Sequence, residues 1–233
     1  MLATGNDDQG VHCSDFQKIS HLHSPKMSSQ YDALKAFISD QYPKMGGWCD
    51  VEKGFQIGKL VIDSKPQRIA EIGVFEGKST LALAHSCKLV GSGTVYAIDS
   101  WKKEDCIDDE VLANQEWWSK LDLDGHYEAF VRHCVRAEVV RHIQFCRMSS
   151  WDASRFLPDM DMVHIDANHA EWPSTSDVVN WLPKLKVGGY MIMDDVNWES
   201  TQTAIRFVEK YCTLIKRYDL NESVFSIYQK TKK

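Results

Sequence analysis

Short apolar runs alternate with amphipathic stretches along most of the chain, from about residue 68 onward. In the amphipathic stretches, apolar residues recur every three or four positions, which predicts helices between the apolar runs. Strands separated by helices predict a mostly parallel, doubly wound sheet with right-handed crossovers. The fold class is therefore α/β and Rossmann-like. The predicted strands lie at residues 69–72, 94–98, 143–146, 162–165 and 190–193.

Helices are predicted after four of these strands, from residue 79 and near residues 127–135, 178–185 and 200–211. Glycine-rich turns separate the elements. They lie at residues 73–77, 91–93 and 188–189. The chain ends with strands near residues 214–218 and 224–228, which predict an antiparallel hairpin around Asn221 and Glu222.

The segments outside this alternation divide the chain into three parts. Residues 1–27 show no sustained period and predict a flexible N-terminal arm. Residues 28–66 have the spacing of two short helices, which would form a helical cap on the core. Residues 67–233 form the main domain, and its acidic, tryptophan-containing stretch at about 102–126 predicts an insertion at the edge of the sheet.

Composition narrows the class of function. The 233 residues suit one α/β domain, and 43% hydrophobic and 26% charged residues are ordinary for a globular protein. A net charge of −6 argues against nucleic acid or an anionic membrane as a partner. We therefore expect a small-molecule substrate.

The cysteines and the N-terminus predict a location. Seven scattered cysteines without a C-x-x-C pair are typical of reduced thiols in the cytoplasm. The first residues are polar, and no stretch reaches the ~18 consecutive apolar residues of a membrane span. Export and membrane insertion are therefore not expected.

The first predicted strand leads into a turn that suits a nucleoside ligand. Gly73 and Gly77 permit close backbone approach, and the N-H groups of the following helix can bind a carboxylate. Asp99 ends the next strand, where it can accept hydrogen bonds from a ribose. The G-x-x-x-G spacing lacks the dinucleotide pattern G-x-G-x-x-G. The alternative is a plain tight turn, with Asp99 capping a helix.

Acidic residues also end two later strands. Asp166 follows one, and Asp194 and Asp195 follow the next, so all three face the ligand side of the sheet. Three adjacent carboxylates repel one another unless protons or a cation intervene, and oxygen ligands favour Mg²⁺, with Mn²⁺ or Ca²⁺ as alternatives. The competing interpretation is that Asp195 caps a helix and Asp166 meets only water.

These motifs, taken in order, resemble a known family. The runs at 70–80, 96–101, 163–169 and 188–195 are similar to those of class I S-adenosylmethionine (SAM) methyltransferases. Within that class they resemble the metal-dependent O-methyltransferases of antibiotic and surface-sugar biosynthesis, such as macrolide-sugar and cephalosporin-pathway members. The resemblance spans about residues 45–230.

The resemblance implies roles for individual residues. The divalent ion would bind Asp166, Asp194 and Asp195. His169 would act as the catalytic base together with Asp166, although other relatives use a carboxylate, while His164 is expected to be a core residue. The cofactor-binding set is Glu71, Gly73, Gly77, Ser79, Asp99, Ser100, Trp101, Ser149 and Ser150.

The expected function is thus a SAM- and metal-dependent O-methyltransferase that acts on a hydroxyl of a small acceptor such as a sugar or another diol. Three alternatives share parts of the pattern: a nicotinamide-dependent oxidoreductase, a SAM-binding protein without catalysis, and a SAM enzyme acting on nitrogen or protein. The missing dinucleotide pattern argues against the first, and the carboxylate trio argues against the other two. The N-terminal helices and aromatic insertion could support a homodimer.

Overall fold

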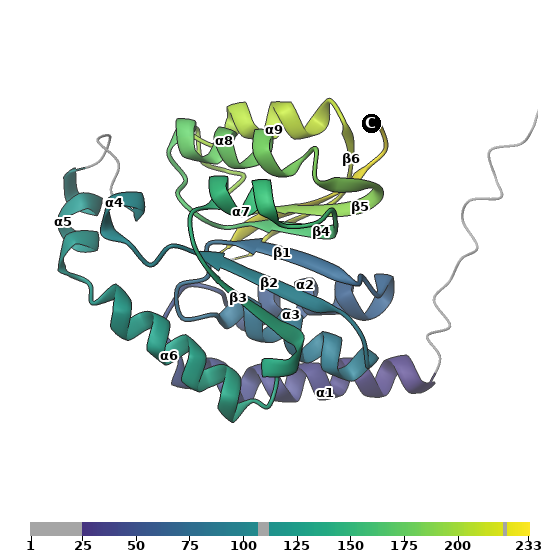
Figure 1. Ribbon diagram of the computed structural model, residues 1–233. Helices are drawn as coiled ribbons and strands as arrows, with labels where there is room; N and C mark the ends of the chain where they lie inside the picture. The colour runs from purple at the N-terminus through teal and green to yellow at the C-terminus, as the bar shows by residue number, and fades with distance from the viewer. Residues whose placement is uncertain (1–24, 107–111, 221–222) are drawn as a thin grey trace, which may run out of the picture.

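The computed structural model of the protein describes residues 25–106, 112–220 and 223–233 (Figure 1). A seven-stranded sheet in the order β3-β2-β1-β4-β5-β7-β6 forms its centre. The neighbours β1, β2, β3, β4 and β5 pair in parallel, whereas β7 is antiparallel to both β5 and β6. The predicted Rossmann-like sheet with an antiparallel C-terminal pair is therefore confirmed.

The strands coincide closely with the apolar runs of the sequence. Their bounds are β1 Arg68–Ile72, β2 Thr94–Asp99, β3 Ile143–Arg147, β4 Met160–Ile165, β5 Leu185–Met193, β6 Cys212–Asp219 and β7 Val224–Lys230. Residues 221–222, around which the hairpin turn was predicted, lie outside the described residues.

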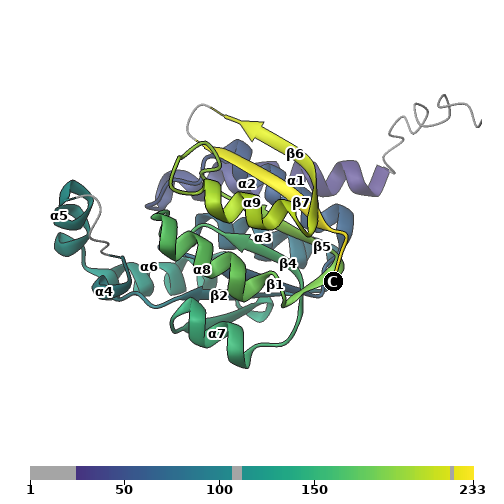
Figure 2. The same ribbon diagram turned by 90° about the horizontal axis from the view of Figure 1, so that it is seen from above.

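Helices cover both faces of the sheet (Figures 1 and 2). α1, α2, α3 and α6 lie on one face, and α7, α8 and α9 lie on the other, while α4 and α5 lie at the periphery. The bounds are α1 Pro25–Gln41, α2 Val51–Ser64, α3 Lys78–Val90, α4 Lys103–Cys106, α5 Leu112–Lys120, α6 Leu123–Arg136, α7 Ser150–Phe156, α8 Glu171–Trp181 and α9 Gln202–Glu209. Short 3-10 helices occur at Tyr42–Lys44 and Val140–His142.

Each face of the sheet has its own hydrophobic core. Successive residues of a strand point to opposite faces, so Ile69 joins the core under α1–α3 while Ala70 joins the core under α7–α9. Both residues have no solvent exposure. Burial on both faces explains why the parallel strands read as continuous apolar runs rather than as alternating patterns.

The N-terminal helices belong to one of these cores. Leu34 and Ile38 of α1 and Ile57 of α2 are fully buried in the same cluster as Ile69 and Val95. Asp50 caps α2 by accepting a hydrogen bond from the backbone N-H of Lys53 at 2.7 Å. The cap fixes where α2 begins and therefore which of its side chains face the sheet.

The structure differs from the sequence prediction at several elements. Gly188 and Gly189 lie inside β5, which begins at Leu185, whereas a turn was predicted there. Gly188 keeps a positive φ of 85°, and the register between β4 and β5 shifts in this region, so a local irregularity replaces the turn. Helix α7 was not predicted, because its seven residues include too few apolar positions to show a period. Helix α1 begins at Pro25, before the expected start.

A core substitution tests the role of α2. Ile57→Ala removes a fully buried side chain, so the free energy of unfolding should fall by about 2–5 kcal/mol. Urea denaturation followed by circular dichroism measures the change. Val51→Ala, on the same helix at 43% exposure, is the matched control and should change stability by less than ~0.5 kcal/mol. Equal losses in the two variants would contradict the packing of α2 against the sheet.

Candidate active site

A cavity of about 940 Å³ opens at the carboxyl ends of the parallel strands. Its walls include the turn after β1, the ends of β2, β4 and β5, and parts of α2, α5 and α8. β1 is followed by β2 on one side of the sheet and β4 by β5 on the other, so the strand order reverses between β1 and β4. Ligands of open α/β sheets bind in the crevice at such a point. The volume suits a cofactor together with a small substrate.

The turn after β1 is packed against the end of β4. Gly73 has a φ of 87°, and a Cβ atom there would lie 2.1 Å from the carbonyl oxygen of Asp166. Gly77 has a φ of 81°, and its Cβ would meet the ring of Phe130 at 2.2 Å. Both glycines line the cavity, and Gly77 precedes the first residue of α3, so the helix N-terminus opens toward the cavity.

Asp99 connects the first two strand ends. Its Oδ2 accepts hydrogen bonds from the backbone N-H groups of Val74 at 2.9 Å and Phe75 at 3.0 Å, and its Oδ1 accepts one from Trp101 at 2.8 Å. Burial raises the pKa of Asp99 against the opposing effect of these three bonds. A carboxylate has about four acceptor positions, so roughly one stays available to a ligand. That capacity suits one ribose hydroxyl without disturbing the turn.

Ser100 and Trp101 continue the wall beside Asp99. Both are buried and line the cavity. The indole N-H of Trp101 donates to the carbonyl oxygen of Phe75 at 2.9 Å. Trp101 and Phe75 have positive φ angles of 49° and 53°, which are uncommon for residues other than glycine. Backbone strain of this kind concentrates at functional sites.

Glu71 lies elsewhere than the resemblance implies. It has no solvent exposure and is absent from the cavity wall. Thr80 Oγ1 donates to one of its carboxylate oxygens, and His164 Nδ1 lies 3.1 Å from the other. Glu71 therefore joins β1, α3 and β4 beneath the site. Ser79, beside Thr80, does line the cavity.

Ser149 and Ser150 lie at the N-terminus of α7, and both line the cavity. Ser149 Oγ accepts the cap hydrogen bond from the Asp152 N-H at 3.1 Å. Ser150 Oγ donates to Asp177 of α8 and accepts from Trp181 Nε1 at 2.9 Å. Burial raises the pKa of Asp177 to about 6. The sequence offered no evident acidic partner here, and the structure supplies Asp177 from 27 residues away.

The strand ends carry a buried ion pair that the sequence analysis missed. Lys53 of α2 is 3% exposed, and its Nζ donates to Asp166 Oδ2 at 2.8 Å and to Asp194 Oδ2. Burial acts to lower the pKa of Lys53, but the charges of Asp166 and Asp194 outweigh it and raise that pKa well above its usual range. Lys53 is therefore the charged partner of both strand ends.

The two aspartates respond differently to this environment. Burial acts to raise the pKa of Asp166, but Lys53 and His164 outweigh it and lower that pKa. Burial, followed by the charge of Asp166, raises the pKa of Asp194 to about 6. The pair is a coupled system in which Asp166 is the stronger acid.

His169 and Asp195 face each other on the ligand side of this pair. His169 Nε2 lies 3.4 Å from Asp195 Oδ2 and 3.8 Å from Asp166 Oδ1, and it has no hydrogen-bond partner among the described residues. The imidazole lies 5.3 Å from the indole ring of Trp198. Asp195 has a φ of 46°, which is uncommon for residues other than glycine. The structure thus brings both predicted catalytic residues together.

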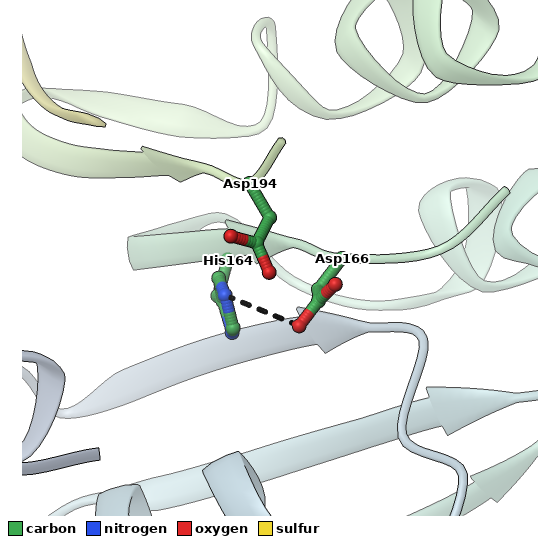
Figure 3. Close-up of side chains that lie close together, drawn as sticks. All are labelled: His164, Asp166 and Asp194. Atoms are coloured by element: carbon green, nitrogen blue, oxygen red, sulfur yellow. Dashed lines mark ion pairs between the residues drawn. The ribbon is translucent and has the colours of Figure 1, made fainter. Parts of the chain in front are cut away.

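The predicted metal ligands do not converge as one group. Asp166 and Asp194 instead lie within 4.8 Å of His164, which was predicted to be a core residue and is fully buried (Figure 3). Lys53 already donates to one oxygen of each of these aspartates, and Asp195 faces His169. As arranged, the donor set holds an ammonium group and does not fit a divalent ion on the same oxygens.

Aromatic residues surround the mouth of the cavity. The ring of Trp48 lies 5.3 Å from that of Phe75 and 5.4 Å from that of Trp117. Trp172 and Trp198 also line the cavity and are 78% and 45% exposed. These faces offer apolar surface to a ligand that lies above His169.

Known proteins identify the family of this chain. Residues 70–196, more than half of its length, match the family described as "Methyltransferase domain". The chain belongs to this family of methyltransferase domains. A curated relative, "Uncharacterized protein y4gI" of Sinorhizobium fredii, is 24% identical over 145 residues, which are 58% of this chain. The chain covers only 14% of that relative's length.

Solved structures share the fold across most of the chain. Cofactor-bound Rv0187 from MTB has a TM-score of 0.61 at 15% identity, covering 91% of this chain and 92% of its own. The O-methyltransferase TomG of Streptomyces achromogenes, in complex with SAM, has a TM-score of 0.57 at 19% identity, covering 93% and 94%. An O-methyltransferase of Bacillus cereus, in complex with SAH, has a TM-score of 0.56 at 15% identity, covering 91% and 94%.

The predicted resemblance to class I methyltransferases is therefore confirmed for the methyltransferase-domain family and for the fold. No helix among the described residues is long and apolar enough to cross a membrane.

A glycine substitution tests the packing at the point where the strand order reverses. Gly73→Ala places a Cβ against the backbone of Asp166 and should lower the free energy of unfolding by more than about 2 kcal/mol. Gly91→Ala is the matched control, because Gly91 has a similar φ of 86° but no atom within 4 Å of the added Cβ. Urea denaturation compares them. If both variants lose the same stability, the close contact between the two strand ends is not as described.

Proposed function

We propose that this chain is a SAM-dependent O-methyltransferase that acts on a hydroxyl group of a small acceptor. One observation carries the proposal. A single cavity contains a glycine turn at a helix N-terminus, an aspartate with spare acceptor capacity, and an imidazole between two carboxylates. The first two features suit the cofactor, and the third suits deprotonation of an acceptor.

The cofactor-side residues fit the charged and polar parts of SAM. The N-terminus of α3 after Gly77 suits the methionine carboxylate, because its N-H groups are free of helical partners. Asp99 suits a ribose hydroxyl through its remaining acceptor position. Ser149 and Ser150 flank the end where the adenine would lie.

In the proposed reaction, the protein mainly aligns the two reactants and accepts the proton of the hydroxyl group. When bound, SAM supplies an activated methyl group, which moves from sulfur to the acceptor oxygen as the carbon–sulfur bond breaks and a carbon–oxygen bond forms. His169 takes the hydroxyl proton on Nε2. Asp195 and Asp166 stabilise the imidazolium, since their oxygens lie 3.4 and 3.8 Å from that nitrogen. The aromatic walls hold the acceptor against His169.

The proposal extends to the chemical class of the acceptor. A sugar or another vicinal diol remains the proposed acceptor class, with the exposed faces of Trp172 and Trp198 as the support. The divalent ion predicted from the sequence is not part of this proposal, because Lys53 already supplies a cation to two of the three carboxylates. A cytoplasmic location, a homodimer and the absence of nucleic-acid or membrane partners also stay proposals from composition and pattern.

Removing the charge of Asp99 tests the cofactor site. Asp99→Asn keeps the size of the side chain but removes a charge-assisted hydrogen bond, so the Kd for SAM should rise roughly 10- to 100-fold. Isothermal titration calorimetry with SAM measures it. Asp159→Asn, at an exposed acid outside the cavity wall, is the control and should leave the Kd unchanged. An unchanged Kd in Asp99→Asn would remove Asp99 from the proposed site.

Replacing His169 tests the proposed base. His169→Gln should lower kcat by about 10²- to 10⁴-fold while the Kd for SAM stays within about twofold, because proton transfer is lost and cofactor contacts are kept. Formation of SAH is followed with the best acceptor from a panel of sugars, other vicinal diols and catechol. His85→Gln, a histidine stacked on Phe37 outside the cavity wall, is the control. A full rate in His169→Gln would assign the base to another group.

A further inference from the structure

Lys53 lies between the ends of β4 and β5, where it contacts both Asp166 and Asp194. It is separated from Asp166 by 113 residues and from Asp194 by 141 residues, yet its Nζ donates to both. Among the described residues, its ammonium has no other hydrogen-bond acceptor. Since an ammonium has three donors, one N-H stays available, and Lys53 lines the cavity.

The fold directs Lys53 to this position. Asp50 caps α2 and sets its first turn, and Lys53 shares the buried face of the helix with Ile57 and Val61, four and eight residues later. Gly54 lies against Tyr42, where a Cβ would approach the phenol oxygen to 2.1 Å, so the start of α2 is closely packed. The lysine is therefore held in place from its own helix as well as by the aspartates.

A divalent ion and this ammonium compete for the same oxygens. Mg²⁺ binds carboxylate oxygens at 2.0–2.1 Å and demands near-octahedral geometry. An ion on Asp166 Oδ2 and Asp194 Oδ2 would lie within a few ångströms of Lys53 Nζ, where two positive charges repel strongly in a buried site. Asp195, the third predicted ligand, is turned to His169.

The structure also shows which atoms would bind a metal ion in the absence of Lys53. Asp194 Oδ1 and His164 Nε2 are buried without a hydrogen-bond partner among the described residues. They are the atoms that an ion would recruit if Lys53 withdrew, together with Asp166 (Figure 3). Glu71 beside His164 Nδ1 would then orient the imidazole, as carboxylates do for histidine ligands.

We propose that Lys53 is the resident cation of this site and takes the place of a divalent metal, so that the protein binds SAM and transfers methyl groups without one. The catalytic part of this inference rests on the proposed function, whereas the occupancy of the site by Lys53 does not. Lys53 is a positioning residue: it holds Asp166 beside His169 and joins Asp194 to the same cation.

Binding of Mn²⁺ to the EDTA-treated protein, followed by electron paramagnetic resonance, tests the occupancy directly. The wild-type protein should bind no Mn²⁺ that depends on Asp194, so wild type and Asp194→Asn should give the same titration. Lys53→Met removes the ammonium but keeps an unbranched stem, and it should gain an Mn²⁺ site that wild type lacks, seen as an apparent Kd at least tenfold lower than that of any Mn²⁺ binding by wild type. Adding Asp194→Asn to Lys53→Met should abolish that gain.

Lys78→Met is the matched control, because Lys78 also lines the cavity but donates to the Gly47 carbonyl oxygen at 2.8 Å and not to an aspartate. It should leave Mn²⁺ binding as in wild type. If Lys53→Met does not fold, the wild-type and Asp194→Asn titrations still show whether the wild-type site binds a divalent ion. Tight Mn²⁺ binding by wild type that Asp194→Asn abolishes would overturn the proposal.

SAM titration separates this inference from the proposed function. The Kd of wild type for SAM, and its rate of SAH formation, should agree within about twofold in EDTA and in Mg²⁺. A rate that requires Mg²⁺ would overturn metal-free transfer. If SAM does not bind in either condition, the proposed function fails, but the Mn²⁺ titrations still report whether Lys53 occupies the site.

Discussion

The ion pair of Lys53 with Asp166 and Asp194 connects helix α2 to the carboxyl ends of β4 and β5, where the proposed active site lies. Removing one partner of a buried ion pair commonly costs about 3–5 kcal/mol, because the charge left behind stays buried. The position of Asp166 next to His169, and hence the geometry of the proposed base, depends on this contact. Helix α2 thus contributes to the site as well as to the core.

A second constraint acts on the backbone where the strand order reverses. Gly73 brings the turn after β1 against the carbonyl group of Asp166, so the residues proposed to bind the cofactor and those proposed to face the acceptor are in direct contact. Asp99 fixes the other side of the turn through two backbone N-H groups. In the proposed reaction, strand ends that are in contact would keep the methyl donor and the methyl acceptor close together. Alignment of these two reactants is the main requirement of methyl transfer.

The sequence predicted the features that depend on local pattern and missed those that depend on distant contacts. Continuous apolar runs revealed the parallel strands because both faces of the sheet are buried, and the acidic strand ends followed from the ligand side of such sheets. Lys53 was missed because a lysine next to an apolar helix stripe usually faces water. Its spacing from Ile57 and Val61 was the available signal.

Two other features lay beyond sequence reasoning for related reasons. Glu71 belongs to a matching motif, but its burial depends on Thr80 and His164, which belong to other elements. The short α7 has no hydrophobic period, so the contact of Ser150 with Asp177 had no sequence signal.

Calorimetric titration of the wild-type protein with SAM, and in parallel with NAD⁺, tests the central claim most directly. The account predicts one SAM bound per chain with micromolar affinity and no heat of binding from NAD⁺. Binding of NAD⁺ without binding of SAM would contradict it and favour a nicotinamide-dependent enzyme on the same fold.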